Sequence, residues 1–187
     1  MSQVHKQKLD TKFEVFGNYI LLKKLAEGGM AEVFLARPST HMGNGRVQVI
    51  KRLLPHFSHQ SMFLSMFQNE IQLIMGFCHP NTVQLHDFGQ VADQPFIAME
   101  FLDGKNLKDL MLKVQEKGEK LPIPVVLSLV IQAAAGLDYA DSFTNGVTGE
   151  KANTIHRDIS PQNLIVSYEG NLKVIDFGIA KANSNLD

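Results

Sequence analysis

One stretch near the C-terminal end of the sequence constrains the fold more than any other. Residues 155–163 read Ile-His-Arg-Asp-Ile-Ser-Pro-Gln-Asn, and Asp176 begins an Asp-Phe-Gly tripeptide. The residues between them, 164–175, have the pattern of two short strands joined by a Glu-Gly-Asn turn. Such a hairpin would bring Asp158 and Asn163 close to Asp176. Two carboxylates and a carboxamide around one point can orient a hydroxyl nucleophile and hold a divalent cation through oxygen ligands.

The same residues resemble the signatures of a known family. His-Arg-Asp at 156–158, the amide at Asn163 and Asp-Phe-Gly at 176–178 are similar to the H-R-D-L-x-x-x-N and D-F-G motifs of protein kinases. Gly-Gly-Met-Ala-Glu-Val at 28–33 and Ser-Pro-Gln-Asn at 160–163 look most like bacterial members of the eukaryotic-type serine/threonine protein kinases.

The resemblance implies an α+β, bilobal fold. Residues 13–102 would form an N-terminal lobe with a five-stranded antiparallel sheet and one helix. Residues 103–187 would form the first part of a mainly helical C-terminal lobe, with the hinge, two helices, the catalytic loop and the Asp-Phe-Gly motif. Residues 1–12 are polar and lack periodicity, so we expect a flexible tail. Because the sequence ends shortly after Gly178, we expect the activation segment and later helices to be missing and apolar surface to be left open.

Composition excludes several other classes of protein. A hydrophobic content of 44%, a charged content of 20% and a net charge of -1 are ordinary for a globular protein and give no sign of a nucleic-acid or anionic-membrane partner. The single cysteine, Cys78, excludes an internal disulfide and favours a reducing compartment. The N-terminus is too polar for a signal peptide, and we expect no membrane segment in the chain. These observations predict a cytoplasmic protein.

Periodicity places the secondary structure around these motifs. A helix is expected over 58–76, where apolar residues recur at three- and four-residue spacing. A short amphipathic helix is expected at 107–117, and a longer one after Pro122. The buried stripe of the longer helix would be Val126, Leu129, Val130, Ala133, Leu137 and Ala140. The five strands are expected at 19–25, 32–37, 47–52, 83–88 and 95–101.

The loop between the first two of these strands contains two glycines. A hairpin of this kind can lay backbone N–H groups over phosphates, because no side chain blocks the approach. By resemblance it is the glycine-rich loop of kinases, but only Gly28 falls on a glycine position of the G-x-G-x-x-G pattern. Ala26 and Ala31 replace the outer glycines. Taken alone, the loop is better explained as an ordinary hairpin turn.

Lys51 and Glu70 are expected to form an ion pair. Lys51 ends a Val-Gln-Val-Ile-Lys run similar to the V-A-I-K motif, and Glu70 lies among the apolar residues of the first helix. Without a partner, a lysine at the end of an apolar strand is usually solvated, and the glutamate would be a surface carboxylate. The resemblance implies instead that Glu70 holds the Lys51 ammonium over the α- and β-phosphates of ATP.

The resemblance also implies a binding site for the rest of the nucleotide. Val33 and Val49 would cover the adenine, the backbone of Glu100 and Leu102 would hydrogen-bond its edge, and Met99 would be the gatekeeper. The full set of nucleotide-binding residues would be Ala26, Glu27, Gly28, Gly29, Met30, Val33, Val49, Lys51, Met99, Glu100, Leu102, Asn106 and Ile165, with Asn106 near the ribose.

The reaction implied is transfer of the γ-phosphoryl of ATP, with Mg²⁺, to a serine or threonine hydroxyl of a protein substrate. Asp158 would orient the hydroxyl or accept its proton, Asn163 and Asp176 would bind the metal, and Lys51 with Glu70 would position the phosphates. Ser160 departs from the family, because serine/threonine kinases usually carry lysine there. An alternative is therefore a nucleotide-binding pseudokinase, or a truncated kinase fragment that acts by partner binding.

Overall fold

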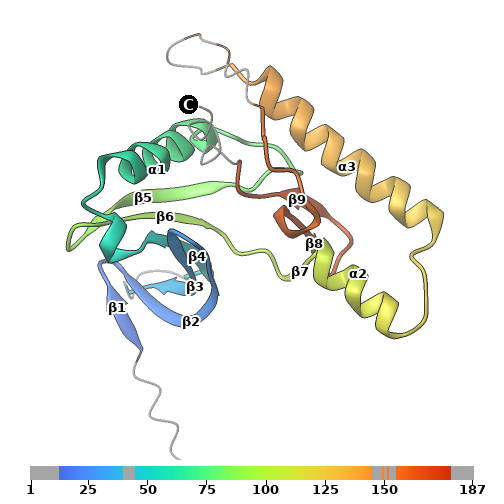
Figure 1. The fold of residues 1–187 in the computed structure, drawn as a ribbon, viewed down its shortest axis with the longest axis horizontal. Helices are drawn as coiled ribbons and strands as arrows, with labels where there is room; N and C mark the ends of the chain where they lie inside the picture. The colour runs from blue at the N-terminus through green and yellow to red at the C-terminus, as the bar shows by residue number, and fades with distance from the viewer. Residues whose placement is uncertain (1–12, 40–44, 145–148, 150, 152–154, 178–187) are drawn as a thin grey trace, which may run out of the picture.

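The computed structural model describes residues 13–39, 45–144, 149, 151 and 155–177 (Figure 1). Its N-terminal half is an antiparallel sheet with the order β1-β2-β3-β4-β6-β5, and α1 lies beside it. The strands are β1 (Glu14–Phe16), β2 (Tyr19–Glu27), β3 (Ala31–Pro38), β4 (Gln48–Leu53), β5 (Leu85–Val91) and β6 (Gln94–Glu100). The five predicted strands are present, and β1 adds a sixth at the edge. Sequence patterning missed β1 because it has three residues and only Phe16 is buried.

Helix α1 (Ser61–Ile74) confirms the predicted helix with shorter ends. Its buried residues recur on one face and are Met66, Phe67, Glu70, Ile71 and Ile74. A 3₁₀ turn over Pro55–Phe57 precedes the helix. Gly76, with a φ of 99°, follows its end, and this left-handed conformation is one that glycine adopts without steric cost.

The C-terminal half contains two helices and a small second sheet. Helix α2 (Leu107–Glu116) follows β7 (Gly104–Asn106), and α3 (Ile123–Ser142) comes next. The predicted hairpin is formed by β8 (Leu164–Ser167) and β9 (Leu172–Val174), and β7 pairs with β8 to complete a three-stranded sheet. The hairpin starts directly after a 3₁₀ turn, Pro161–Asn163, and β9 leads into Asp176. The two ends of the hairpin therefore lie close together, with Asn163 before β8 and Asp176 after β9.

Two clusters of buried apolar residues pack on opposite faces of the N-terminal sheet. One cluster packs on the outer face, and Ile50 belongs to it together with Phe16, Phe34 and Phe96. The other cluster continues from Leu53 on the opposite face through α1 to buried residues of α3 and β9. Because side chains alternate along a strand, Arg52 shares the face of Ile50 and Lys51 shares the face of Leu53.

Helix α3 is less covered than its sequence predicts. Leu129 and Ala140 are buried as expected, but Val126 and Val130 are 40% and 58% exposed, so the predicted stripe is wrong at these two positions. The periodicity identifies an apolar helix, but not which of its residues meet a neighbour. Other exposed apolar residues on α3 are Ile123, Val125, Leu127 and Ile131, in agreement with the expectation of open apolar surface.

By length and composition alone, α3 could also cross a membrane, since it has 20 residues and a mean hydropathy of 1.6 over an 18-residue window. The expectation that the chain has no membrane segment stays a prediction, because these two criteria alone do not show a membrane span. Core helices pass the same test, and α3 packs on β9, with Gln132 accepting a hydrogen bond from the Leu172 amide at 2.8 Å. Gly136 lies so close to the loop before β5 that an added Cβ would approach the Asn81 carbonyl oxygen to 2.5 Å. This contact needs a glycine.

Candidate active site

Lys51, Glu70 and Asp176 meet at the junction of the two lobes. The Lys51 Nζ atom lies 2.6 Å from Glu70 Oε1 and 2.7 Å from Asp176 Oδ1. Lys51 comes from β4, Glu70 from α1, and Asp176 is the second residue after the end of β9. The side chains of Lys51 and Glu70 are 12% and 10% exposed, whereas that of Asp176 is 44% exposed and faces the cleft. The pair predicted between Lys51 and Glu70 is therefore present, with Asp176 as a second partner.

The electrostatics of this group keep the lysine charged. Burial opposes the ammonium, but the charges of Asp176 and Glu70 raise the pKa of Lys51 above its ordinary value. The Lys51 charge lowers the pKa of Asp176 despite partial desolvation. Burial instead raises the pKa of Glu70. The cleft thus presents an ammonium beside an ionised Asp176 carboxylate.

The loop that contains His156 and Asp158 is fixed to the residues that follow β9. The ring Nε2 of His156 lies 3.1 Å from the Ile175 carbonyl oxygen, and the ring packs 4.9 Å from that of Phe177. Arg157 and Asp176 have φ values of 59° and 52°, in the left-handed region that non-glycine residues seldom adopt. Such backbone strain persists where the surrounding structure imposes it, as it does at many functional sites. The two strained residues lie on either side of the hairpin.

Asn163 and Asp176 provide a donor set that suits Mg²⁺. The Asn163 Nδ2 atom donates to the backbone oxygen of Asp158 at 2.9 Å and to its Oδ2 at 3.4 Å, so its carboxamide oxygen is the atom that could bind a metal. No group of three or more His, Cys, Asp or Glu suited to a metal occurs among the described residues. Magnesium typically binds through one or two protein oxygens plus phosphate oxygens and water, so these two residues fit a metal that arrives with a nucleotide.

Two adjoining cavities connect these groups to the rest of the predicted site. The first, of about 400 Å³, is lined by Val33, Val49, Lys51, Met99, Glu100, Leu102, Asn106, Asn163, Ile165 and Asp176. The second, of about 890 Å³, is lined by Ala26, Glu27, Gly28, Gly29, Met30, Lys51, Glu70, Asp158, Asn163 and Asp176. Lys51 and Asp176 border both cavities, so one crevice holds every residue predicted for the nucleotide, the metal and the reaction.

The loop between β2 and β3 forms the roof of the second cavity. The Gly28 N–H donates to the Ala31 carbonyl at 2.8 Å, and the Leu54 N–H donates to the Met30 carbonyl at 2.9 Å. Neither Gly28 nor Gly29 has a positive φ, and an added Cβ at Gly29 would meet nothing within 4 Å. The backbone itself does not require these glycines. They leave room beside the cleft, as a phosphate-binding loop requires.

The structure refines two of the predicted nucleotide contacts. The Glu100 N–H already donates to the Gln84 carbonyl at 3.0 Å, so a backbone hydrogen bond from this residue to adenine must use its carbonyl. Its carboxylate accepts from Lys173 Nζ of β9 at 2.6 Å and joins the hinge to the C-terminal lobe. Asn106 caps α2, because its Oδ1 accepts from the Asp109 N–H at 2.8 Å. Its side chain is therefore committed to the helix as well as bordering the cavity.

Several residues that line the first cavity were not predicted from the sequence. They are Leu25, Val83, Phe101, Gly104, Lys105, Asp109, Gln162 and Ile175. Most are chain neighbours of predicted residues, so proximity to Ala26, Leu102, Asn163 or Asp176 could have indicated them. Asp109 had a further signal, since Asn-x-x-Asp before an amphipathic run is typical of a helix N-terminus.

Comparisons with known proteins agree with this geometry. The sequence model of the "Protein tyrosine and serine/threonine kinase" family matches residues 19–187. The chain is 46% identical over 171 residues to "Tyrosine-protein kinase MasK" of Myxococcus xanthus, covering 91% of this chain and 26% of that protein. It is 34% identical over 166 residues to "Probable serine/threonine-protein kinase PknB" of Lactococcus lactis, covering 89% and 24%.

Solved structures show the same likeness. The kinase domain of PknI from Mycobacterium tuberculosis superposes with a TM-score of 0.70 at 29% identity, over 91% of this chain and 63% of that one. The chain spans about a quarter of the length of the curated relatives it matches. Because the family model covers nearly all of the described residues and the catalytic motifs lie in one crevice, the chain belongs to the protein tyrosine and serine/threonine kinase family.

Proposed function

We propose that this chain contributes the nucleotide-binding and catalytic-loop half of a protein kinase that transfers the γ-phosphoryl of Mg-ATP to serine or threonine hydroxyls. The observation that carries the proposal is the position of Lys51 between Glu70 and Asp176, at 2.6 and 2.7 Å. This arrangement holds helix α1, an ammonium that could face the phosphates and a carboxylate that could bind the metal close together. Phosphoryl transfer depends mainly on such positioning and charge neutralisation.

The described residues suggest a role for each group. Asn163 and Asp176 would bind Mg²⁺, which shields the charge of the phosphates during transfer. Lys51 would contact the α- and β-phosphates. Asp158, held near Asn163, would orient the substrate hydroxyl and accept its proton. The apolar walls made by Val33, Val49 and Ile165 suit a flat purine ring.

The choice of serine and threonine over tyrosine rests on the catalytic loop. Pro161 and Asn163 follow the serine/threonine pattern noted in the sequence, and PknB of Lactococcus lactis is named as a probable serine/threonine kinase. MasK is named as a tyrosine kinase, and its higher identity makes tyrosine the competing acceptor. Phosphoamino-acid analysis of a phosphorylated protein mixture distinguishes the two, and label found only on tyrosine would overturn this part of the proposal.

A second candidate, a nucleotide-binding pseudokinase, is favoured by Ser160. Lys51 and Lys105 are the cations among the described residues that line the two cavities, and Lys51 already holds two carboxylates. A missing transition-state cation would cost roughly 10²–10³ in rate. If Ser160 limits catalysis, Ser160→Lys should raise the rate of transfer. An unchanged rate would indicate that another group supplies the charge.

The central test separates binding from transfer. Asp158→Asn should abolish transfer of labelled phosphate but keep thermal stabilisation by Mg-ATP, because the residue acts on the acceptor hydroxyl. Asp176→Asn should lose both, since it removes a metal ligand. Equal transfer by wild type and Asp158→Asn would contradict the catalytic assignment. Stabilisation without transfer in the wild type would favour the pseudokinase.

A further inference from the structure

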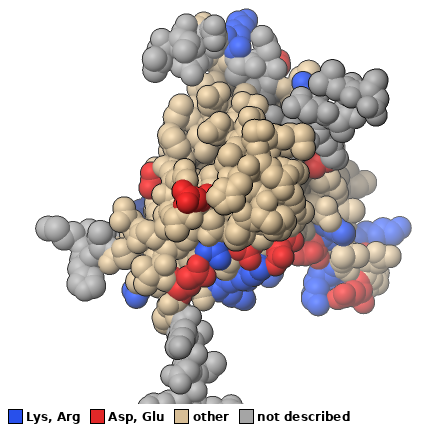
Figure 2. All heavy atoms as spheres, turned by 60° about the vertical axis from the view of Figure 1, so that its left-hand side comes forward, with Lys and Arg blue, Asp and Glu red and all other residues tan. Residues whose placement is uncertain are grey.

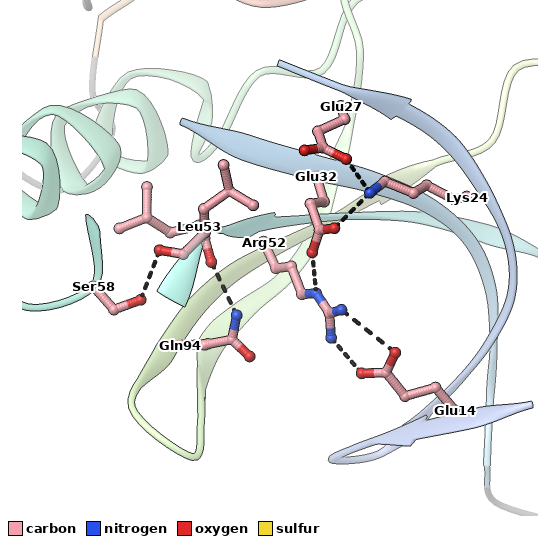
Figure 3. A network of polar contacts seen from close by, with 9 residues as sticks. Glu14, Lys24, Glu27, Glu32, Arg52, Leu53, Ser58 and Gln94 are labelled. Atoms are coloured by element: carbon pink, nitrogen blue, oxygen red, sulfur yellow. Dashed lines mark hydrogen bonds and ion pairs between the residues drawn. The ribbon is translucent and has the colours of Figure 1, made fainter. Parts of the chain in front are cut away.

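A second charged network lies on the outer face of the N-terminal sheet, next to the loop between β2 and β3 (Figure 3). Lys24 Nζ contacts the Glu27 carboxylate and lies 2.6 Å from Glu32 Oε1. Arg52 Nε donates to Glu32 Oε2 at 3.1 Å, and the same guanidinium holds the Glu14 carboxylate. The network joins β1, β2, β3 and β4. In Figure 2, charged side chains of both signs gather in a band along the lower part of the visible face, below a largely uncharged region.

The network offsets the repulsion between two carboxylates at the ends of the loop between β2 and β3. Glu27 and Glu32 are directly paired across the β2–β3 hairpin, and theirs is the register pair nearest the turn. Like charges directly opposite each other on neighbouring strands destabilise the pairing. Lys24 lies between the two carboxylates and hydrogen-bonds both. The hydrogen bonds to Glu27 and Glu32 raise the pKa of Lys24, and lysine is in any case a cation at neutral pH.

The position of Glu27 matters for a nucleotide. Glu27 lines the same cavity as Gly28, Gly29 and Lys51, where the phosphates are proposed to bind. If Lys24 did not hold it on the outer face, the Glu27 carboxylate would be free to approach this cavity and would repel a triphosphate. Because Lys24 holds the Glu27 carboxylate, the negative charge of Glu27 is neutralised and stays next to the end of β2.

Arg52 supports this arrangement from the other side. Its guanidinium lies 4.6 Å from the Phe34 ring centroid and 5.2 Å from that of Phe16, so it is fixed by two aromatic rings as well as by two carboxylates. The end of the same strand is held by Gln94, which donates to the Leu53 carbonyl at 3.1 Å. Glu32 is therefore bound to Arg52, whose side chain is held in place, and Glu32 in turn binds Lys24.

We infer that Lys24 is a positioning residue for ATP: it neutralises Glu27 and Glu32, and so holds the glycine-poor loop in a conformation that accepts the phosphates. The inference deepens the proposed function and rests on it. Arg52 assists by fixing Glu32. Lys24 itself need not touch the nucleotide.

Calorimetric titration of Mg-ATP into matched variants tests the inference. Lys24→Met should weaken binding by about threefold to tenfold, the range expected for one exposed charge near the phosphates. Lys24→Arg should bind nearly as well as the wild type. Adding Glu27→Gln to Lys24→Met should restore binding, because the repelling carboxylate is gone. In activity assays, the KM for ATP should rise while kcat changes little.

Lys113→Met is the matched control, since Lys113 forms an exposed ion pair with Glu116 on α2. The inference is overturned if Lys24→Met weakens binding no more than this control, or if Glu27→Gln restores nothing. Hydrogen exchange without nucleotide gives an independent readout: the amides of 28–31 should exchange faster in Lys24→Met than in Lys113→Met, and equal rates would also overturn it. Absence of Mg-ATP binding by the wild type would instead refute the proposed function, and the exchange rates would still decide whether Lys24 orders the loop.

Discussion

Lys51 and Arg52 are neighbours on β4, yet they serve opposite faces of the sheet. Each is held by two carboxylates. The partners of Lys51 come from α1 and the C-terminal lobe, and the side chains of Glu70 and Asp176 are 10% and 44% exposed. The partners of Arg52 come from β1 and β3, and the Glu14 side chain is 51% exposed. The same kind of ion pair therefore joins the two lobes on one face and orders a single sheet on the other. The side chains of the two groups are similarly exposed, so the groups differ mainly in the elements that they join.

The largest difference should be in catalysis. Lys51→Met should reduce phosphoryl transfer by at least roughly 10²-fold, the effect of deleting one preorganised charge from a transition state. Arg52→Met removes a cation at the next position and should leave most of the activity. Labelled phosphate incorporation into a protein substrate measures both. Equal losses would show that the two faces are not functionally distinct.

Stability should follow the same order. Glu70→Ala leaves the Lys51 charge with one partner in a buried site, and should cost about 3 kcal/mol of unfolding free energy. Glu32→Ala leaves the Arg52 guanidinium with the Glu14 carboxylate and two aromatic rings, and should cost about 1 kcal/mol or less. Urea denaturation compares the two variants. A larger loss for Glu32→Ala would reverse the comparison.

The pH dependence of Asp176 gives a more subtle test. The charge of Lys51 lowers its pKa below that of an unfolded aspartate, about 3.9. Ionised Asp176 therefore contributes stability that is complete above about pH 4 and is lost as the pH falls through the lowered pKa. The stability difference between wild type and Asp176→Asn should shrink over this acidic range. In a Lys51→Met background the cause of the lowered pKa is removed, so this loss of stability at acidic pH should largely disappear.

Salt should produce the smallest effect. The Arg52 network is partly exposed, so 0.5 M NaCl should reduce the stability difference between wild type and Arg52→Met by a few tenths of a kcal/mol, about the size of a screened surface pair. The difference between wild type and Glu70→Ala should respond less, because that pair is shielded from solvent. Thermal unfolding at two salt concentrations measures both.

Much of the site could be predicted, because the sequence motifs specify where its few charged and amide side chains lie along the chain. Lys51, Glu70 and Asp176 were identified from spacing and resemblance, and the structure brings them within hydrogen-bonding distance. The outer network was not predicted, since a sequence does not give the strand register that puts Glu27 opposite Glu32. Register depends on which residues pack below the sheet, and a one-residue shift would separate these charges.

Other differences have equally local causes. Strand β1 is too short to show alternation, so only its contact with β2 defines it. Val126 and Val130 of α3 belong to an apolar helix whose partners the periodicity could not specify. The Glu100 N–H is occupied by Gln84, which no motif at the hinge would reveal.

The ion pair between Glu100 and Lys173 has a consequence for motion. It fastens the hinge to the strand that ends beside Asp176, and the same Lys173 ammonium also donates to the Thr82 carbonyl at 3.0 Å. A rotation of one lobe against the other must then pivot near these atoms. The crevice would widen near the loop between β2 and β3. It would change little near the hinge, where adenine is proposed to bind. Under the proposed function, ATP would therefore enter and leave at the mouth of the crevice, far from the ion pair between Glu100 and Lys173.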